Sequence, residues 1–169
     1  QNKSYKFYGA SIDSRSIKKD NLFVAIKGKK VDGHNFVKKA IKYGAKHCIV
    51  SKLIASVSRK KLTKTNNTIK FLNELATEKR KLSNAKIIAI TGSVGKTTVK
   101  TILGQLLDNY GTTYFSPKSF NNHYGVPISL SNLENSHEFG VFEVGMSKAR
   151  EIHKLSKLIK PDIGIITNI

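Results

Sequence analysis

Cysteine is nearly absent from this sequence, and its scarcity excludes one class of fold. Cys48 is the only cysteine among 169 residues, so the chain cannot form an internal disulfide. A small disulfide-stabilised scaffold is therefore excluded. Because Cys48 lies in the apolar stretch His47–Val50, we expect it to pack in the core of a protein from a reducing compartment.

Long hydrophobic runs are also missing. No stretch of about 18 apolar residues occurs, so the sequence predicts no transmembrane helix and no membrane partner. The first residues, Gln1 to Tyr5, lack the hydrophobic region of a signal peptide. They also lack a starting Met, so we expect the first residue to reflect processing or truncation.

Acidic residues are few, with 11 Asp and Glu against 30 Lys and Arg, for a formal net charge of +19. A surface of this charge attracts polyanions such as nucleotides or nucleic acid. The lysines, however, are spread along the whole chain, and the densest cluster, Arg59-Lys60-Lys61, is short. No RNA-binding signature with interleaved aromatic residues occurs. We therefore expect no specific nucleic-acid partner.

The first half of the chain predicts a small α/β domain. Leu22–Ile26 and Cys48–Val50 are short apolar runs typical of buried strands. Between them, a turn at Asp32-Gly33 is followed by a helix, and Gly44 is placed to cap its end. The apolar face of that helix consists of Phe36, Val37, Ala40 and Ile41.

Residues 51–67 are polar and lack a clear period, and a further helix ends near Leu82. Its apolar face consists of Ile69, Leu72, Leu75 and Ala76. We place the domain boundary after this helix, which gives a first domain of residues 1–83 and a second of residues 84–169.

The second half alternates strands and helices more regularly. Strands are expected at Ile87–Ile90, Thr112–Phe115, Val141–Val144 and Ile163–Thr167. A helix from near Lys96 has the apolar stripe Val99, Ile102, Leu103, Leu106 and Leu107. Another contains Ile152, Leu155 and Ile159 and stops before Pro161, and a loop rich in Ser and Asn follows Phe115. This alternation predicts an α/β fold with a parallel sheet covered on both faces.

The segment Thr91–Thr98 has the chemistry of a phosphate-binding loop. It joins a strand to a helix, so successive backbone N–H groups and the helix dipole point at one anion. Lys96 would reach the β- and γ-phosphates of ATP, and the Thr97 hydroxyl is placed for Mg²⁺. The residues predicted to bind the nucleotide are Gly92, Ser93, Val94, Gly95, Lys96, Thr97 and Thr98.

This loop departs from the general pattern in one place. That pattern would put glycine at position 90, where the chain has Ile90, and the first glycine is Gly92. The alternative is a plain glycine turn between a strand and a helix. Glu143 supports the phosphate loop, because it closes an apolar strand where an acid that holds the nucleotide's metal is expected. A solvated surface acid is the alternative for Glu143.

Six segments of the sequence resemble the Mur ligases, the family that adds amino acids to the cytoplasmic peptidoglycan precursor. In the second half the resemblance rests on the loop Thr91–Thr98, on Phe120–Pro127 (FNNHYGVP), and on Glu143–Met146 followed by Glu151-Ile152. In the first half it rests on Asp13-Ser14-Arg15, Asp20–Gly28 and Asp32–Phe36. The resemblance covers nearly all of the chain. It implies a UDP-binding α/β domain followed by part of an ATP-binding domain with a parallel sheet.

The resemblance also implies a reaction. ATP, with Mg²⁺, would phosphorylate the terminal carboxylate of UDP-MurNAc-tripeptide, and the amine of D-Ala-D-Ala would displace phosphate. Lys96 and Glu143 would be catalytic, Thr97 and Glu143 would hold the metal, and Asn121 and Asn122 would line the substrate side. The uridine end would be contacted by Ser14, Arg15, His34 and Asn35. A surface ion pair is the alternative for Arg15, and a surface histidine is the alternative for His34.

Some positions differ from the family. Lys118-Ser119 replaces the usual Gly-Asn, and Ser147–Arg150 replaces a common Asn-x-x-Gly, which leaves the substrate contacts there open. Family members have about three domains. They carry a metal-binding His, a modified Lys and a further domain beyond the position equivalent to Ile169. We therefore expect a cytoplasmic, monomeric fragment that holds nucleotide but is no competent ligase by itself. The third residue of the peptide stays open.

Two other functions remain possible on the sequence. One is another Mur-type or folylpolyglutamate-type ATP-dependent ligase, which UDP-sugar binding by residues 1–83 would argue against. The other is a basic P-loop protein that binds nucleic acid. Retention on a polyanion that is lost at modest salt, without ATP dependence, would mark that charge as nonspecific.

Overall fold

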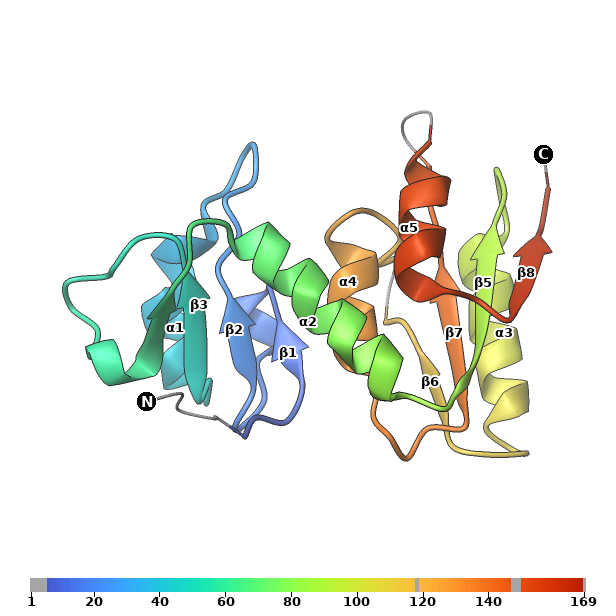
Figure 1. Cartoon of the computed structure of the whole chain (residues 1–169), viewed down its shortest axis with the longest axis horizontal. Helices are drawn as coiled ribbons and strands as arrows, with labels where there is room; N and C mark the ends of the chain where they lie inside the picture. Colours follow the sequence, from blue (N-terminus) through green and yellow to red (C-terminus); the bar gives the residue numbers. More distant parts are fainter. Residues whose placement is uncertain (1–5, 118, 147–149, 169) are drawn as a thin grey trace. The chain divides into compact units, whose positions relative to one another are not determined.

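The computed structural model describes residues 6–117, 119–146 and 150–168 and is drawn in Figure 1. The chain divides into two compact units, one ending at Leu72 and the other starting at Asn73. This division falls inside helix α2 (Thr68–Leu82), whereas the sequence pattern places the domain boundary at the end of that helix.

The first unit is built on a parallel sheet in the order β1-β2-β3-β4. Strands β2 (Leu22–Val24) and β3 (His47–Val50) form where apolar runs predict them. Strands β1 (Ala10–Ser11) and β4 (Leu62–Lys64) were not expected. Both are too short to show a period, and Leu62 is the only fully buried residue of β4, so only pairing with a neighbouring strand reveals them.

Short helices connect these strands. They are η1 (Ser14–Ser16), η2 (Gly33–Phe36), α1 (Val37–Lys42) and η3 (Arg59–Lys61). Helix α1 packs Val37 and Ala40 into the core formed with Phe23 and Cys48, while Phe36 stays 37% exposed. Burial raises the pKa of the Cys48 thiol to about 12, as suits a core residue.

The second unit contains a parallel sheet in the order β6-β7-β5-β8, and Figure 1 shows β5 flanked by β7 and β8. The strands are β5 (Lys86–Thr91), β6 (Thr113–Phe115), β7 (Phe139–Glu143) and β8 (Ile163–Ile166). All four were predicted, and every pairing between them is parallel.

Apolar side chains fill both faces of this sheet. On one face Ile87 and Phe142 pack with Ala76 of α2 and with residues of α4 (Gly125–Leu130) and α5 (Glu151–Ile159). On the other face Ile88 and Ile90 pack against α3 (Lys96–Leu107). Side chains alternate along a strand, so β5 contributes apolar residues to the core on each face of the sheet. This is what the predicted parallel sheet with helices on both faces requires.

Two details of the helices differ from expectation. In α3, Val99, Leu103 and Leu107 face the sheet, whereas Ile102 and Leu106 are 53% and 55% exposed. Helix α4 lies in the Ser- and Asn-rich stretch that was expected to be a loop. All six of its residues are buried, and Pro127 stands in its first turn, where a missing N–H is tolerated. The Ser and Asn residues of this stretch indicated a loop, whereas burial against the rest of the unit stabilises a helix.

No helix in the described part of the chain is long and apolar enough to cross a membrane.

Candidate functional site

The loop between β5 and α3 depends on its two glycines. Gly92 has φ of +136° and Gly95 has φ of +83°, conformations that side chains other than glycine rarely adopt. A Cβ on Gly92 would also lie 2.3 Å from Thr167 Oγ1 and 2.8 Å from the Asn168 carbonyl oxygen. No side chain caps the start of α3 at Gly95, so no capping side chain competes for the first N–H groups of this twelve-residue helix, which are the groups that bind anions.

The end of β8 braces the same loop from the side. The Thr167 hydroxyl donates to the Val94 carbonyl at 2.5 Å, and the Ser93 N–H donates to the Asn168 carbonyl at 3.0 Å. This role of Thr167 was not predicted from the sequence. The available signal was its place at the end of the last predicted strand, since β8 pairs with β5 and therefore ends beside the loop.

Lys96 lies over the loop that it follows. Its ammonium donates to the carbonyls of Gly92 at 2.6 Å and Ser93 at 3.2 Å. These bonds hold one positive charge above the loop, next to the start of α3. Thr97, Thr98, Ser93 and Val94 are exposed around it. The predicted nucleotide-binding residues are thus brought together as one continuous surface.

Glu143 is buried beside this loop and is no solvated surface acid. The register pairs Ile90 of β5 with Glu143 at the end of β7, and the Glu143 side chain is only 2% exposed. Its Oε2 accepts a hydrogen bond from the Thr97 hydroxyl at 2.8 Å. The alternative of an ordinary surface acid is therefore wrong, because the sheet carries the carboxylate directly to the phosphate loop.

Asn121 and Asn122 have different roles in the structure. The Asn121 side-chain amide donates to Glu143 Oε1 at 2.8 Å, and the Asn121 backbone carbonyl accepts from the Gly145 N–H at 2.7 Å. Asn122 is exposed, and its Oδ1 accepts from the backbone N–H groups of Tyr124 and Gly125. Asn121 therefore orients the carboxylate, while the Asn122 side chain caps the start of α4.

Lys100 belongs to this cluster, although its place there was not predicted from the sequence. Its side chain is 2% exposed, and Nζ lies 3.9 Å from Glu143 Oε2. Burial lowers the pKa of Lys100, while the charge of Glu143 raises it. The available signal was its spacing, since Lys100 stands three residues before Leu103 and seven before Leu107, on the buried face of α3.

Oxygen donors for a hard cation are present at one point of the cluster. Thr97 Oγ1 and Glu143 Oε2 lie beside the phosphate loop, and Ser119 Oγ is 3.3 Å from Thr97 Oγ1. Within residues 6–117, 119–146 and 150–168, no group of three or more His, Cys, Asp and Glu side chains could hold a metal. A metal here would therefore need other ligands, such as phosphate and water, as Mg²⁺ commonly has.

In the first unit, Ser14 and Arg15 follow β1. Ser14 is 5% exposed, whereas the Arg15 side chain is 78% exposed. The Arg15 guanidinium pairs with Asp13, with Nη2 2.7 Å from Oδ2, and this hydrogen bond raises the pKa of Arg15. The ion pair suggested as the alternative for Arg15 is thus formed with its own neighbour, which holds the guanidinium in the short turn after β1.

His34 is buried rather than at the surface, so the surface-histidine alternative is wrong. Its Nε2 accepts from the Ser51 backbone N–H at 2.9 Å, and its Nδ1 lies 2.6 Å from Asp32 Oδ1. Because a backbone N–H can only donate, Nε2 carries no proton, and Nδ1–H donates to Asp32. The His34 ring therefore ties the turn before α1 to the end of β3, and the adjacent Asn35 is exposed.

The backbone N–H of His34 is the main cause of a low pKa at Asp32. The His34 ring and the Lys52 ammonium, whose Nζ is 3.1 Å from Oδ2, hold that pKa down further. Ser14, Arg15, His34 and Ser51 all follow strands of one parallel sheet. They therefore share its carboxyl edge, where ligands of open α/β sheets bind.

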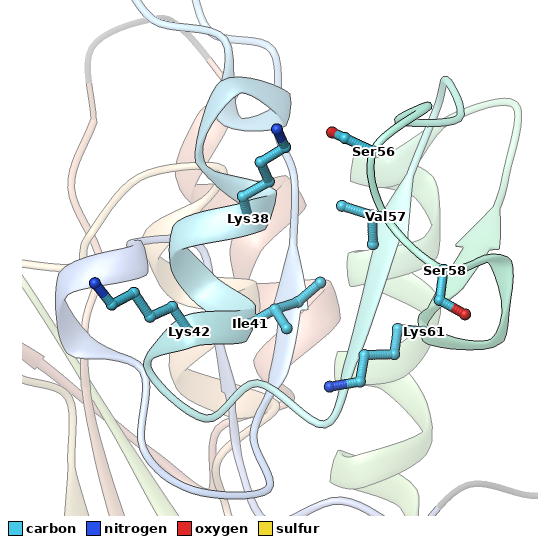
Figure 2. A pocket seen from close by; sticks show the side chains of 7 residues that line it. All are labelled: Lys38, Ile41, Lys42, Ser56, Val57, Ser58 and Lys61. Carbon is cyan, nitrogen blue, oxygen red and sulfur yellow. The ribbon is translucent and has the colours of Figure 1, made fainter.

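A hollow of about 310 Å³ lies elsewhere in the first unit (Figure 2). It is open to solvent between α1 and the segment before β4 and is lined by Lys38, Ile41, Lys42, Ser56, Val57, Ser58 and Lys61. None of the predicted site residues lines it. In the close view, Ile41 and Val57 point toward each other, whereas the Lys42 ammonium points away from them.

Two segments of the sequence differ from the family pattern, and the structure describes only part of each. Lys118 and Ser147–Ala149 lie outside the described residues. Their effect on substrate contacts stays open. Ser119, the second residue of the first departure, is the residue whose hydroxyl lies near Thr97.

Two family descriptions match the chain. "Mur ligase family, catalytic domain" matches residues 6–80, and "Mur ligase middle domain" matches residues 90–169. The UDP-N-acetylmuramoyl-tripeptide–D-alanyl-D-alanine ligase of Rickettsia prowazekii is 40% identical over 157 residues, 93% of this chain and 35% of that protein. The enzyme of the same name from Borreliella burgdorferi is 42% identical, over 94% of this chain and 37% of that protein.

Solved structures agree with these matches. A crystal structure of MurF from Acinetobacter baumannii aligns with a TM-score of 0.82 and 32% identity, covering all of this chain and 37% of the other. MurF from Thermotoga maritima, in complex with ADP, aligns with a TM-score of 0.75 and 31% identity, over 95% of this chain and 37% of that one. The chain thus spans little more than a third of the length of these relatives.

Proposed function

The chain belongs to the Mur ligase family, of which it carries an N-terminal and a middle domain, and on this premise we propose its function. It is the precursor-binding and ATP-binding part of a ligase that joins D-Ala-D-Ala to UDP-MurNAc-tripeptide. The relatives named above carry out this reaction by name, which favours it over folate-type ligation and over nucleic-acid binding. ATP and a UDP-linked precursor imply work in the cytoplasm. The expected monomer stays a prediction.

The observation that carries the proposal is the contact between Thr97 and Glu143. It joins the first turn of α3 to the end of β7, directly beside the glycine loop. A hydroxyl and a carboxylate at this place are the protein ligands that Mg²⁺ takes beside nucleotide phosphates. The residues present therefore fit a magnesium–nucleotide complex, in which the metal would neutralise charge on the β- and γ-phosphates.

The chain's own residues would act on the phosphates by position and charge. The N–H groups of the glycine loop and of the first turn of α3 would bind phosphate oxygens. Lys96 would exchange its bonds to the Gly92 and Ser93 carbonyls for bonds to the nucleotide. Its charge would then stabilise the γ-phosphoryl group as it passes to the tripeptide carboxylate. Glu143, held by Asn121, would keep its orientation throughout.

The uridine end of the precursor would lie at the carboxyl edge of the first sheet. Arg15 and Asn35 are exposed there and can reach a ligand directly. His34 has both ring nitrogens engaged, so its part is to hold the turn that presents Asn35. This assigns direct contact to Arg15 and Asn35 and a positioning role to His34.

Nucleotide binding is tested by Lys96→Ala in the chain itself. We expect this variant to lose Mg-ATP affinity by at least about tenfold, because one charged contact to phosphate is removed. Lys157→Ala, an exposed lysine of α5, is the matched control and should leave the affinity unchanged. Isothermal titration on folded protein decides, and equal affinities for the Lys96 variant and wild type would exclude a phosphate-binding role for the loop.

Precursor binding is tested separately by amide chemical shifts. UDP-MurNAc-tripeptide should shift the resonances of residues 13–15 and 33–36, and it should bind more tightly than UDP-MurNAc-dipeptide. Arg15→Ala should weaken this binding, whereas Lys46→Ala, an exposed lysine before β3, should not. Shifts confined to the second unit would exclude the first unit as the precursor site, and a preference for the dipeptide would indicate a different member of the family.

A further inference from the structure

The cluster beside the phosphate loop contains a cation of its own. Lys100 and Glu143 are each only 2% exposed in their side chains, and Lys100 Nζ lies 3.9 Å from Glu143 Oε2. A carboxylate buried without a compensating charge is costly, so Lys100 makes an ionised Glu143 tolerable in this place. The pair accounts for two buried charges that would otherwise oppose folding.

Helix α3 presents two groups to the same carboxylate oxygen. Thr97 and Lys100 are three residues apart, which places their side chains on one face of the helix. The Thr97 hydroxyl donates to Oε2 at 2.8 Å, and the Lys100 ammonium approaches Oε2 at 3.9 Å. Asn121 holds the other oxygen, Oε1, at 2.8 Å. The carboxylate is therefore fixed from three sides, and among these three described partners Lys100 is the charged one.

The charge balance has a consequence for any divalent cation. Glu143 and Lys100 together carry no net charge, so a metal held by Thr97 and Glu143 would meet an attracting carboxylate whose partner ammonium, 3.9 Å from Oε2, repels it. Charges at such distances interact strongly where water is excluded. Phosphate oxygens of a nucleotide would supply the missing negative charge. The affinity for a metal alone should then be low and should rise when a nucleotide occupies the loop.

We propose that Lys100 is the resident counter-ion of Glu143 and makes metal binding at Thr97 and Glu143 depend on the nucleotide. This inference rests on the proposed nucleotide function of the same site. It makes Lys100 a positioning residue, which acts on the metal and the phosphates only through Glu143 and through its charge.

The test measures Mn²⁺ binding to the chain without nucleotide, by electron paramagnetic resonance of the free ion. Lys100→Met keeps the length of the side chain and removes its charge, and it should bind Mn²⁺ at least about tenfold more tightly than wild type. Lys100→Arg keeps the charge and should stay close to wild type. Glu143→Gln combined with Lys100→Met should abolish the gain, because the attracting carboxylate is lost. Unchanged or weaker Mn²⁺ binding by folded Lys100→Met would overturn the proposal.

A second measurement needs no variant. Wild-type chain should bind Mn²⁺ at least about tenfold more tightly with saturating ADP than without it, after correction for Mn²⁺ held by free ADP. Equal affinity in the two states would overturn the role of Lys100 even where Lys100→Met does not fold. Binding of ADP in the presence of saturating Mn²⁺ is measured alongside. Its absence would contradict the proposed nucleotide site, whereas the comparison of Lys100 variants with Mn²⁺ alone would still decide on the counter-ion.

Discussion

Replacing His34 by Leu separates a positioning role from direct ligand contact. The substitution places an apolar side chain in the same buried position and removes the hydrogen bonds of the ring. The Ser51 backbone N–H loses its acceptor at 2.9 Å, and the Asp32 carboxylate loses its donor at 2.6 Å. Asn35→Ala is the matched control, because Asn35 is the exposed neighbour in the same turn.

The magnitude follows from these two bonds. An ordinary hydrogen bond, such as the part-buried bond from the Ser51 N–H, contributes about 0.5–1.5 kcal/mol, and a hydrogen bond to a charged group contributes about 1.5–3 kcal/mol. The losses are not additive, because Asp32 keeps the backbone N–H of His34 and the Lys52 ammonium. We expect His34→Leu to lower the free energy of unfolding of the first unit by about 3 kcal/mol. The control should stay within about 0.5 kcal/mol of wild type.

The assay is urea unfolding, followed on the amide resonances of residues 6–72. Resonances of the first unit are needed because two units can unfold separately, so that one overall transition is not defined. Under native conditions, His34→Leu should also weaken binding of the UDP-linked precursor, whereas loss of affinity without loss of stability would mean direct contact. A destabilisation below about 1 kcal/mol, or one equal to that of Asn35→Ala, would refute the structural account of the ring.

Three further predictions follow from the structure. The pKa of Asp32 is lowered in the folded chain, so the stabilising effect of its carboxylate is present above the unfolded value of about 3.9 and is lost as pH falls below that value. Asp32→Asn should therefore reduce the fall in the free energy of unfolding that wild type shows at acidic pH. Gly92→Ala should distort the loop, because the added Cβ would contact Thr167 and Asn168, and should lower Mg-ATP affinity by about tenfold or more in a titration. Gly164→Ala is the control, because a Cβ there meets nothing within 4 Å, and it should bind Mg-ATP like wild type. Cys48, whose pKa is raised to about 12 by burial, should resist alkylation at pH 8 in folded protein and react only in denaturant, and rapid native labelling would contradict its place in the core.

Most of the fold was predictable because the second unit is locally consistent. Its strands are apolar runs, and its helices α3 and α5 follow apolar periods that end at recognisable signals such as Pro161. The elements that escaped prediction were short. Strands β1 and β4 and helix α4 have too few residues for a period, and they exist because neighbouring elements bury them or pair with them.

In the candidate site, too, local sequence patterns indicated some features, and tertiary contacts decided the others. Gly92, Gly95, Lys96 and Thr97 are contiguous in the chain, and their spacing alone indicates a phosphate loop. The predicted roles of the site residues remain predictions, but the structure brings Glu143 and Asn121 to that loop from 46 and 24 residues beyond Thr97. No local pattern could show that Lys100 pairs with Glu143, since the pairing depends on the register between β5 and β7.

By itself, the sequence determined the α/β class, the two-part organisation, the phosphate loop and the resemblance to Mur ligases. Each of these depends on the local spacing of apolar residues and glycines, and that spacing can be read directly from the sequence. Only the tertiary structure decided that His34 is buried between Asp32 and Ser51, that Thr167 braces the glycine loop, and that a buried lysine faces Glu143. These features depend on which strand ends lie side by side, because burial and charge pairing arise from neighbours in space rather than in the chain.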